Sequence, residues 1–155
     1  MSTIHVEAAR TIASEPDAVY RFISDYRQSR PRILPSNYEG YIVEKGGKGA
    51  GTVVRYVLHA GGRQRAYEMH VMEPGQRTLV ERDAGSSLVT TWHVTPTNDA
   101  SKARVIITTE WQGGSGVGGF FERTFAPGGV RRIYRDMLQR LEGEMTSVSR
   151  EQLTR

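Results

Sequence analysis

The sequence predicts an α+β fold in which a strongly curved antiparallel sheet wraps around one long C-terminal helix. At least five segments before residue 113 have the character of strands, and short turn signals join them. Short loops between consecutive strands favour antiparallel hairpins over parallel crossovers. A glycine-rich loop, Gly113–Gly119, then leads into a helix-like stretch from about Phe120 to about Ser149. Such an arrangement tends to leave a cavity between sheet and helix, so the fold itself suggests a small-molecule binder.

Composition narrows the class of protein. At 155 residues, the chain is expected to form a single domain, residues 1–155, with a substantial core. The absence of cysteine excludes disulfides, thiolate zinc sites and cysteine nucleophiles. The N-terminus shows no secretory signal, and no apolar run approaches the roughly 20 residues that a membrane span needs. We therefore expect a soluble, cytoplasmic protein.

The charge distribution argues against nucleic-acid binding. The formal net charge is +4, and arginine supplies most of the positive charge. Basic residues are interleaved with acidic ones, and the densest groups, Arg27–Arg32 and Arg131–Arg135, are not sustained blocks. A nucleic-acid footprint would need a clustered basic face. The sequence does not indicate the oligomeric state.

The chain begins with a predicted strand over residues 3–13, followed by two short helices. Ser14 is the predicted N-cap, and Pro16 suits the first helical turn. This helix should end near Arg27, and Pro31 and Pro35 limit any further helix to one turn. The strands expected after them are Tyr38–Glu44, Thr52–Ala60, Arg63–Met72, Thr78–Asp83, Leu88–Thr95 and Ala103–Trp111.

Hairpin geometry predicts which side chains share a face. A two-residue turn at Gly61-Gly62 places Arg55 opposite Glu68. A three-residue loop at residues 85–87 would place Arg82 beside Thr90, and pairing Val94 with Val105 would place Thr90 beside Thr109. The inner face is then apolar apart from one polar row, which consists of Arg82, Thr90 and Thr109, with two further hydroxyls from Tyr56 and Tyr67.

Neither the glycine motif nor the histidines indicate a cofactor or metal site. Residues 114–119 match G-x-G-x-x-G, but a dinucleotide site needs a parallel strand after the helix, and here the chain ends in the helix. The histidines have no metal-ligand spacing, and His59, His70 and His93 are expected on the outer face. We therefore expect no cofactor and no metal.

The C-terminal helix should cover the cavity. Phe121 and Phe125 recur at i, i+4, as do Ile133 and Met137, and Pro127–Gly129 predicts a kink that leaves room for a ligand. Trp92 and Trp111 should lie on the concave face against this helix. The candidate ligand-binding residues are Tyr56, Tyr67, Met69, Arg82, Thr90, Trp92, Thr109, Trp111, Phe121, Phe125, Ile133 and Met137.

The order of elements resembles the START-like helix-grip (SRPBCC) superfamily, which includes polyketide cyclases/dehydrases, lipid-transfer domains and the birch-pollen-allergen group. Local matches are Ile12–Asp25, Gly49–Thr52 and Val94–Pro96. The resemblance implies the helix-grip fold and its cavity. It implies no catalytic residue, because the members share no catalytic set: some cyclise aromatic polyketides, some carry hydrophobic ligands and some regulate partners.

Three functions follow as hypotheses. The first is binding of a small hydrophobic ligand, lipid-like or polyketide- and aromatic-like, in the cavity. The second is a polyketide cyclase/dehydrase-type enzyme, in which Arg82 polarises a carbonyl and Tyr56 or Tyr67 transfers a proton. The third is a regulatory or interaction protein that uses the exposed end of the helix. For Arg82, pairing with neighbouring acids at the surface is the competing interpretation.

Overall fold

The computed structural model describes residues 2–113 and 125–153. Its strands are β1 (Ser2–Ile12), β2 (Tyr38–Lys45), β3 (Val53–Ala60), β4 (Arg63–Gly75), β5 (Thr78–Asp83), β6 (Val89–Pro96) and β7 (Ala103–Gly113). Its helices are α1 (Pro16–Ser24), the 3₁₀ helix η1 (Arg30–Ile33) and α3 (Pro127–Leu153). The strands form one antiparallel sheet in the order β1-β7-β6-β5-β4-β3-β2.

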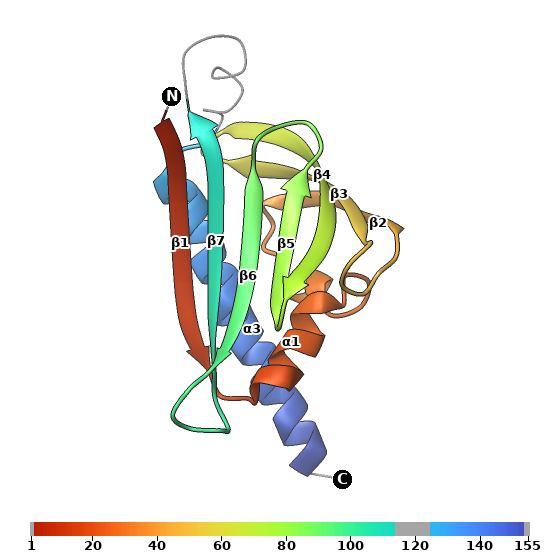
Figure 1. Ribbon diagram of the computed structural model, residues 1–155, viewed down its shortest axis with the longest axis vertical. Helices are drawn as coiled ribbons and strands as arrows, with labels where there is room; N and C mark the ends of the chain where they lie inside the picture. The colour runs from red at the N-terminus through yellow and green to blue at the C-terminus, as the bar shows by residue number, and fades with distance from the viewer. Residues whose placement is uncertain (1, 114–124, 154–155) are drawn as a thin grey trace.

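The curved sheet and α3 form two layers (Figure 1). Helix α3 packs along β1 and against η1, while α1 contacts β6 and β7. Only β1 departs from sequence order in the sheet, because it pairs with β7 along its whole length. The α+β helix-grip arrangement, including the two short helices after the first strand, is therefore confirmed.

Two predicted registers are confirmed. In the β3–β4 hairpin, Gly61 and Gly62 have φ angles of 58° and 78°, the left-handed conformation that such a turn requires. Arg55 lies opposite Glu68, and the Arg55 Nη2–Glu68 Oε1 distance is 2.6 Å. Between β6 and β7, Thr90 is paired with Thr109, as expected.

The β5–β6 register differs from the prediction by one residue. Arg82 is paired with Val89, and Glu81 is paired with Thr90. The Asp83 N–H donates to the Leu88 carbonyl at 3.0 Å, so four residues rather than three form the loop. A one-residue slip moves every side chain of a strand to the other face. Arg82 is therefore exposed on the outer face, and Glu81, only 6% exposed, lies on the inner face.

The start of α3 also differs from the prediction. Phe125 and Ala126 are not helical, and the helix begins at Pro127 instead of bending there. Proline suits a first helical position, because its fixed φ fits the helix and its missing N–H would have no partner in the first turn. The rest of the predicted loop and helix start, including Phe121, lies outside the described residues.

The predicted N-cap of α1 is also wrong. Its N-cap residue is Glu15, and no side chain caps the helix there, so Ser14 does not play the predicted role. Pro16 at the first helical position fixes the start of the helix instead.

The core lies between the inner face of the sheet and α3. The predicted stripe on α3 is buried, with Ile133, Met137 and Leu141 at most 5% exposed. Trp92 is 1% exposed and Trp111 is 4% exposed, and both lie on the inner face with Thr90 and Thr109. Burial of this helix stripe against the sheet joins the two layers.

We predict that Trp92→Ala lowers the free energy of unfolding by about 3–5 kcal/mol, because it removes a large buried ring and leaves a cavity. Urea denaturation of the variant and of the wild type measures the change. The matched control is Thr91→Ala, since Thr91 precedes Trp92 in β6 and lies on the outer face. A loss below about 0.5 kcal/mol for Trp92→Ala, as for an ordinary surface substitution, would contradict the packing described.

Candidate ligand-binding site between the sheet and helix α3

A small cavity lies between the sheet and the start of α3. Its volume is about 30 Å³. Val130 and Tyr134 line it from α3, and Phe125 lies just before that helix. The candidate residues that line it are Tyr56, Tyr67, Met69, Thr90, Trp111 and Phe125. The sequence thus predicts much of the wall of this cavity.

A second cavity of about 30 Å³ lies deeper, beside η1. The side chains that line both cavities are Tyr38, Tyr56, Thr90 and Tyr134. The second cavity adds Trp92 and Met137 from the predicted set, together with Arg30 and Glu81. The two cavities are thus neighbouring parts of one region under the sheet, separated by shared side chains.

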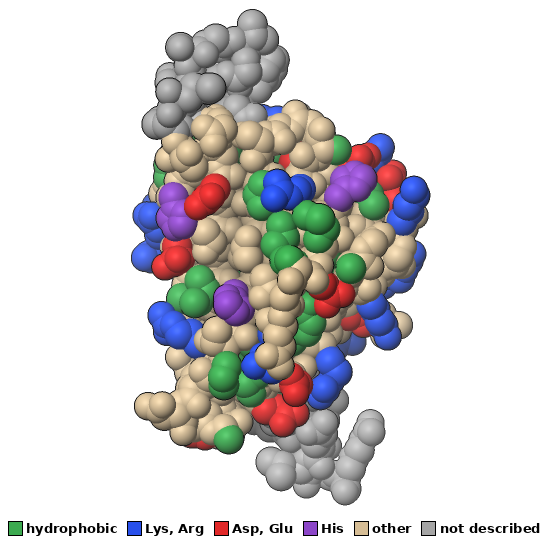
Figure 2. All heavy atoms as spheres, viewed as in Figure 1, with side chains coloured by type: hydrophobic (Ala, Val, Ile, Leu, Met, Phe, Trp, Pro, Cys, Tyr) green, Lys and Arg blue, Asp and Glu red, His purple; other side chains and the backbone are tan. Residues whose placement is uncertain are grey.

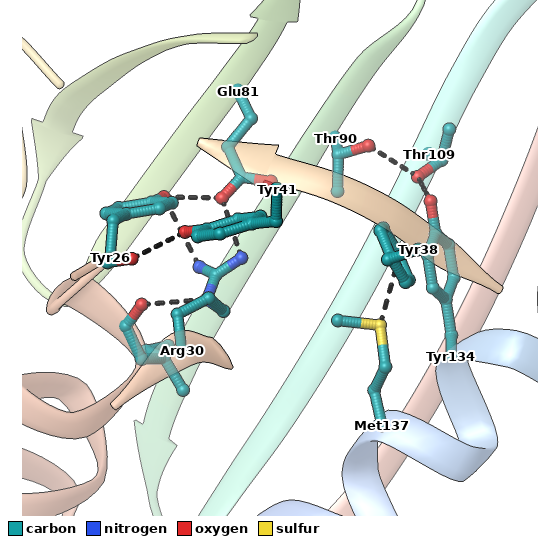
Figure 3. Close-up of polar contacts among 10 residues, drawn as sticks. Tyr26, Arg30, Tyr38, Tyr41, Glu81, Thr90, Thr109, Tyr134 and Met137 are labelled. Atoms are coloured by element: carbon teal, nitrogen blue, oxygen red, sulfur yellow. Dashed lines mark hydrogen bonds and ion pairs between the residues drawn. The ribbon is translucent and has the colours of Figure 1, made fainter. Parts of the chain in front are cut away.

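The floor of the second cavity is a buried ion pair. Arg30 Nη1 lies 3.0 Å from Glu81 Oε2, and both side chains are at most 7% exposed. The Tyr26 hydroxyl donates to the same carboxylate oxygen, and Arg30 Nε donates to the Ile23 carbonyl at 2.9 Å (Figure 3). This network brings η1, α1 and β5 together.

Aromatic rings also hold the Arg30 guanidinium. Its Cζ atom lies 4.5 Å from the Tyr26 ring centroid and 4.3 Å from that of Trp92. Burial is the largest single effect on the pKa of Arg30 and would lower it, but the charge and hydrogen bond of Glu81, together with Tyr26 and Tyr41, outweigh burial and raise the pKa. Arg30 therefore stays charged beside Glu81.

A chain of hydroxyl groups crosses from the sheet to α3. Thr90 Oγ1 lies 2.8 Å from Thr109 Oγ1, and Thr109 also shares a hydrogen bond with the Tyr134 hydroxyl (Figure 3). The predicted neighbourhood of Thr90 and Thr109 is therefore confirmed. Tyr134, which the sequence analysis missed, completes the row in place of Arg82. Tyr134 directly follows Ile133 on the buried stripe of α3, and this position could have identified it from the sequence.

Aromatic rings form much of the remaining wall. The ring centroids of Tyr38 and Tyr56 are 5.0 Å apart, those of Tyr56 and Tyr67 are 5.8 Å apart, and those of Tyr67 and Phe125 are 6.5 Å apart. The Tyr38 hydroxyl donates to the Met137 sulfur at 3.4 Å. A continuous series of rings therefore runs from β2 through β3 and β4 to Phe125, two residues before α3.

The wall tyrosines are neutral. Desolvation raises the pKa of Tyr38, Tyr56 and Tyr134 above the usual value for a phenol. They keep their protons at neutral pH, so the wall offers hydroxyl groups and ring faces rather than phenolate charge.

The described candidates that line neither cavity are Thr109, Arg82 and Ile133. Thr109 is fully buried and bonded to Thr90 and Tyr134. Arg82 is exposed on the outer face, which excludes it from the region between sheet and helix. Ile133 is buried in the core on α3.

The outer face of the sheet carries dispersed charges (Figure 2). Two of its histidines each lie beside an acid, His59 at 2.6 Å from Glu39 and His70 at 2.8 Å from Glu68. Across residues 2–113 and 125–153, no group of three or more histidine or acidic side chains could hold a metal ion. No helix in the same ranges is long and apolar enough to cross a membrane.

Comparison with known proteins assigns the fold and the family. Residues 3–146 match the family described as polyketide cyclase / dehydrase and lipid transport. The solution structure of KanY protein is 43% identical, with a TM-score of 0.81 over 93% of this chain and 98% of that chain. A search of the curated proteins finds no match.

Two more distant structures share the fold alone. Zhui aromatase/cyclase from Streptomyces sp. R1128 is 19% identical, with a TM-score of 0.73 over 92% of this chain and 93% of that chain. Norcoclaurine synthase from Thalictrum flavum, in complex with dopamine and hydroxybenzaldehyde, is 16% identical. Its TM-score is 0.70 over 94% of this chain and 88% of that chain.

The raised tyrosine pKa values predict a loss of stability in base. Unfolded tyrosines ionise near pH 10, whereas the desolvated tyrosines of the wall keep their protons. Ionisation therefore lowers the free energy of the unfolded state before that of the folded state. The contribution of these tyrosines to the free energy of unfolding is fully present below about pH 10. It is lost as the pH rises from there towards their pKa in the folded state.

Urea denaturation at several pH values, with tyrosinate absorbance as a second signal, measures this effect. Tyr134→Phe should reduce the slope of unfolding free energy against pH by up to about 1.4 kcal/mol per pH unit above pH 10. Ionisation of all the tyrosines near pH 10 in a protein that stays folded would contradict the burial described.

Proposed function

Since the chain belongs to the polyketide cyclase / dehydrase and lipid transport family, we propose that it binds a small, largely apolar molecule between the sheet and α3. The observation that carries the proposal is the aromatic wall that runs from Tyr38 through Tyr56 and Tyr67 to Phe125. Ring faces favour a flat or alicyclic ligand, and a few hydroxyls among them can orient it.

The small volume of the two cavities sets a condition on this proposal. A volume of about 30 Å³ has room for only about two waters, whereas sites for drug-sized ligands are about 10 to 30 times larger. The side chains that separate the two cavities must therefore move when the ligand enters. Rotation of Tyr38 or Tyr56, which are only partly buried, would join the two cavities without breaking the Arg30–Glu81 pair.

A second candidate function is a cyclase or dehydrase-type reaction in the same region. The observation in its favour is the Glu81 carboxylate, which lines the deeper cavity together with the phenols of Tyr26 and Tyr41. A carboxylate and phenols are groups that donate and accept protons. Burial raises the pKa of Tyr26 and Tyr41, however, so these phenols are poor proton donors and binding is the function favoured.

Cavity filling tests the binding function. Val130 lines the cavity from α3, so Val130→Phe should lower the affinity for the neutral fluorescent probe N-phenyl-1-naphthylamine at least about tenfold, or about 1.4 kcal/mol. Fluorescence titration measures the affinity, and circular dichroism checks the fold, since overpacking costs about 1–3 kcal/mol.

The matched control places the same substitution on the opposite face. Val80 lies on the outer face of β5, so Val80→Phe should leave the affinity unchanged. Arg82→Met should leave it unchanged as well, because Arg82 is exposed on that face. Equal affinity in Val130→Phe and the wild type would place the probe outside the cavity and contradict the proposal.

A further inference from the structure

One buried donor in the cavity lacks an acceptor. The Trp111 side chain is 4% exposed and lines the first cavity. Its Nε1 atom is buried and has no hydrogen-bond partner, and it is the single side-chain nitrogen or oxygen in this condition among the described residues. The indole N–H can only donate, so nothing but an acceptor can satisfy it.

The position of Trp111 follows from the strand that carries it. Trp111 lies two residues after Thr109 on β7, and successive side chains of a strand alternate between faces. Its indole therefore shares the inner face with the hydroxyl chain. The hydroxyls of Thr90, Thr109 and Tyr134 bond to one another, and none of them is a hydrogen-bond partner of Trp111 Nε1. Buried polar groups are nearly always paired, and an exception calls for an explanation.

The charges around the cavities are already balanced. Arg30 is paired with Glu81 in the deeper cavity. Arg65, which lines the first cavity, lies 4.0 Å from Asp83 at Nη2 and packs over the Tyr67 ring. A charged ligand would add an unpaired buried charge, which is costly. A ligand that presents a neutral hydrogen-bond acceptor would add no such charge.

We propose that Trp111 selects the ligand by donating its indole N–H to a neutral carbonyl oxygen. The ligand class is then an aromatic or alicyclic ketone, quinone or ester rather than a hydrocarbon or a carboxylate. This inference rests on the proposed binding function, and it names the chemistry that the binding site recognises.

Two isosteric probes isolate the hydrogen bond. 2-Acetylnaphthalene carries a carbonyl oxygen where 2-isopropenylnaphthalene carries a methylene group. Isothermal titration calorimetry should give the wild type about fivefold higher affinity for the ketone, a ratio within the range of one neutral hydrogen bond. In Trp111→Phe, which keeps a ring and removes the N–H, this preference should vanish.

Nitrogen-15 NMR on the wild type provides a test that does not depend on the stability of the variant. The chain has two tryptophans, so it has two indole N–H signals. The ketone should shift the Trp111 signal downfield, and the alkene should not. Trp111→Phe assigns the signal where it folds, and Trp92→Phe does so otherwise.

The possible outcomes distinguish the role of Trp111 from the binding function itself. Equal affinities of both probes for the wild type, a ketone preference that survives in Trp111→Phe, or an unmoved Trp111 signal would overturn the role of Trp111 and leave the binding function standing. Binding of neither probe would contradict the binding function, and this inference with it.

Discussion

The buried ion pair between Arg30 and Glu81 is the interaction on which the arrangement of the site depends. It joins η1, which follows α1, to the inner face of β5 on the other side of the core. Both charges have left water, so each is tolerated only while the other is in place. The Tyr26 hydroxyl and the rings of Tyr26 and Trp92 complete the enclosure of Arg30. This network closes the floor of the deeper cavity and leaves its interior electrically balanced.

Because the buried charges are paired, the chemistry of the remaining cavity walls determines which ligands can bind. Hydroxyl groups, neutral phenols and ring faces cover the region between the Arg30–Glu81 pair and Phe125, with Trp111 near its outer end. Desolvation keeps the wall phenols protonated. Such a surface favours an apolar ligand oriented by one or two neutral oxygen atoms. It is less suited to proton transfer, because the carboxylate that lines the deeper cavity already accepts bonds from Arg30 and Tyr26.

Local geometry explains which parts of this account the sequence could predict. The Gly61-Gly62 turn leaves one plausible register, so the pairing of Arg55 with Glu68 follows from it. The β5–β6 loop admits three or four residues, and the bond from Ser86 Oγ to Asp83, at 2.7 Å, supports the longer form. The one additional loop residue places Glu81, rather than Arg82, on the inner face. The partner of Glu81 is 51 positions away in the sequence, so no local pattern identifies Arg30. The contact between Thr109 and Tyr134 is likewise tertiary, whereas the apolar stripe of α3 was visible from its periodicity.

A double-mutant cycle on Arg30 and Glu81 tests the central claim most directly. Urea denaturation would be measured for the wild type, Arg30→Met, Glu81→Leu and the double variant. Each single substitution leaves a buried charge unpaired and should cost about 3–5 kcal/mol, whereas the double variant should recover most of that loss. The exposed Arg55–Glu68 pair, treated the same way, should show a much smaller coupling. Additive losses at Arg30 and Glu81 would mean that the two side chains do not depend on each other, and would contradict the account.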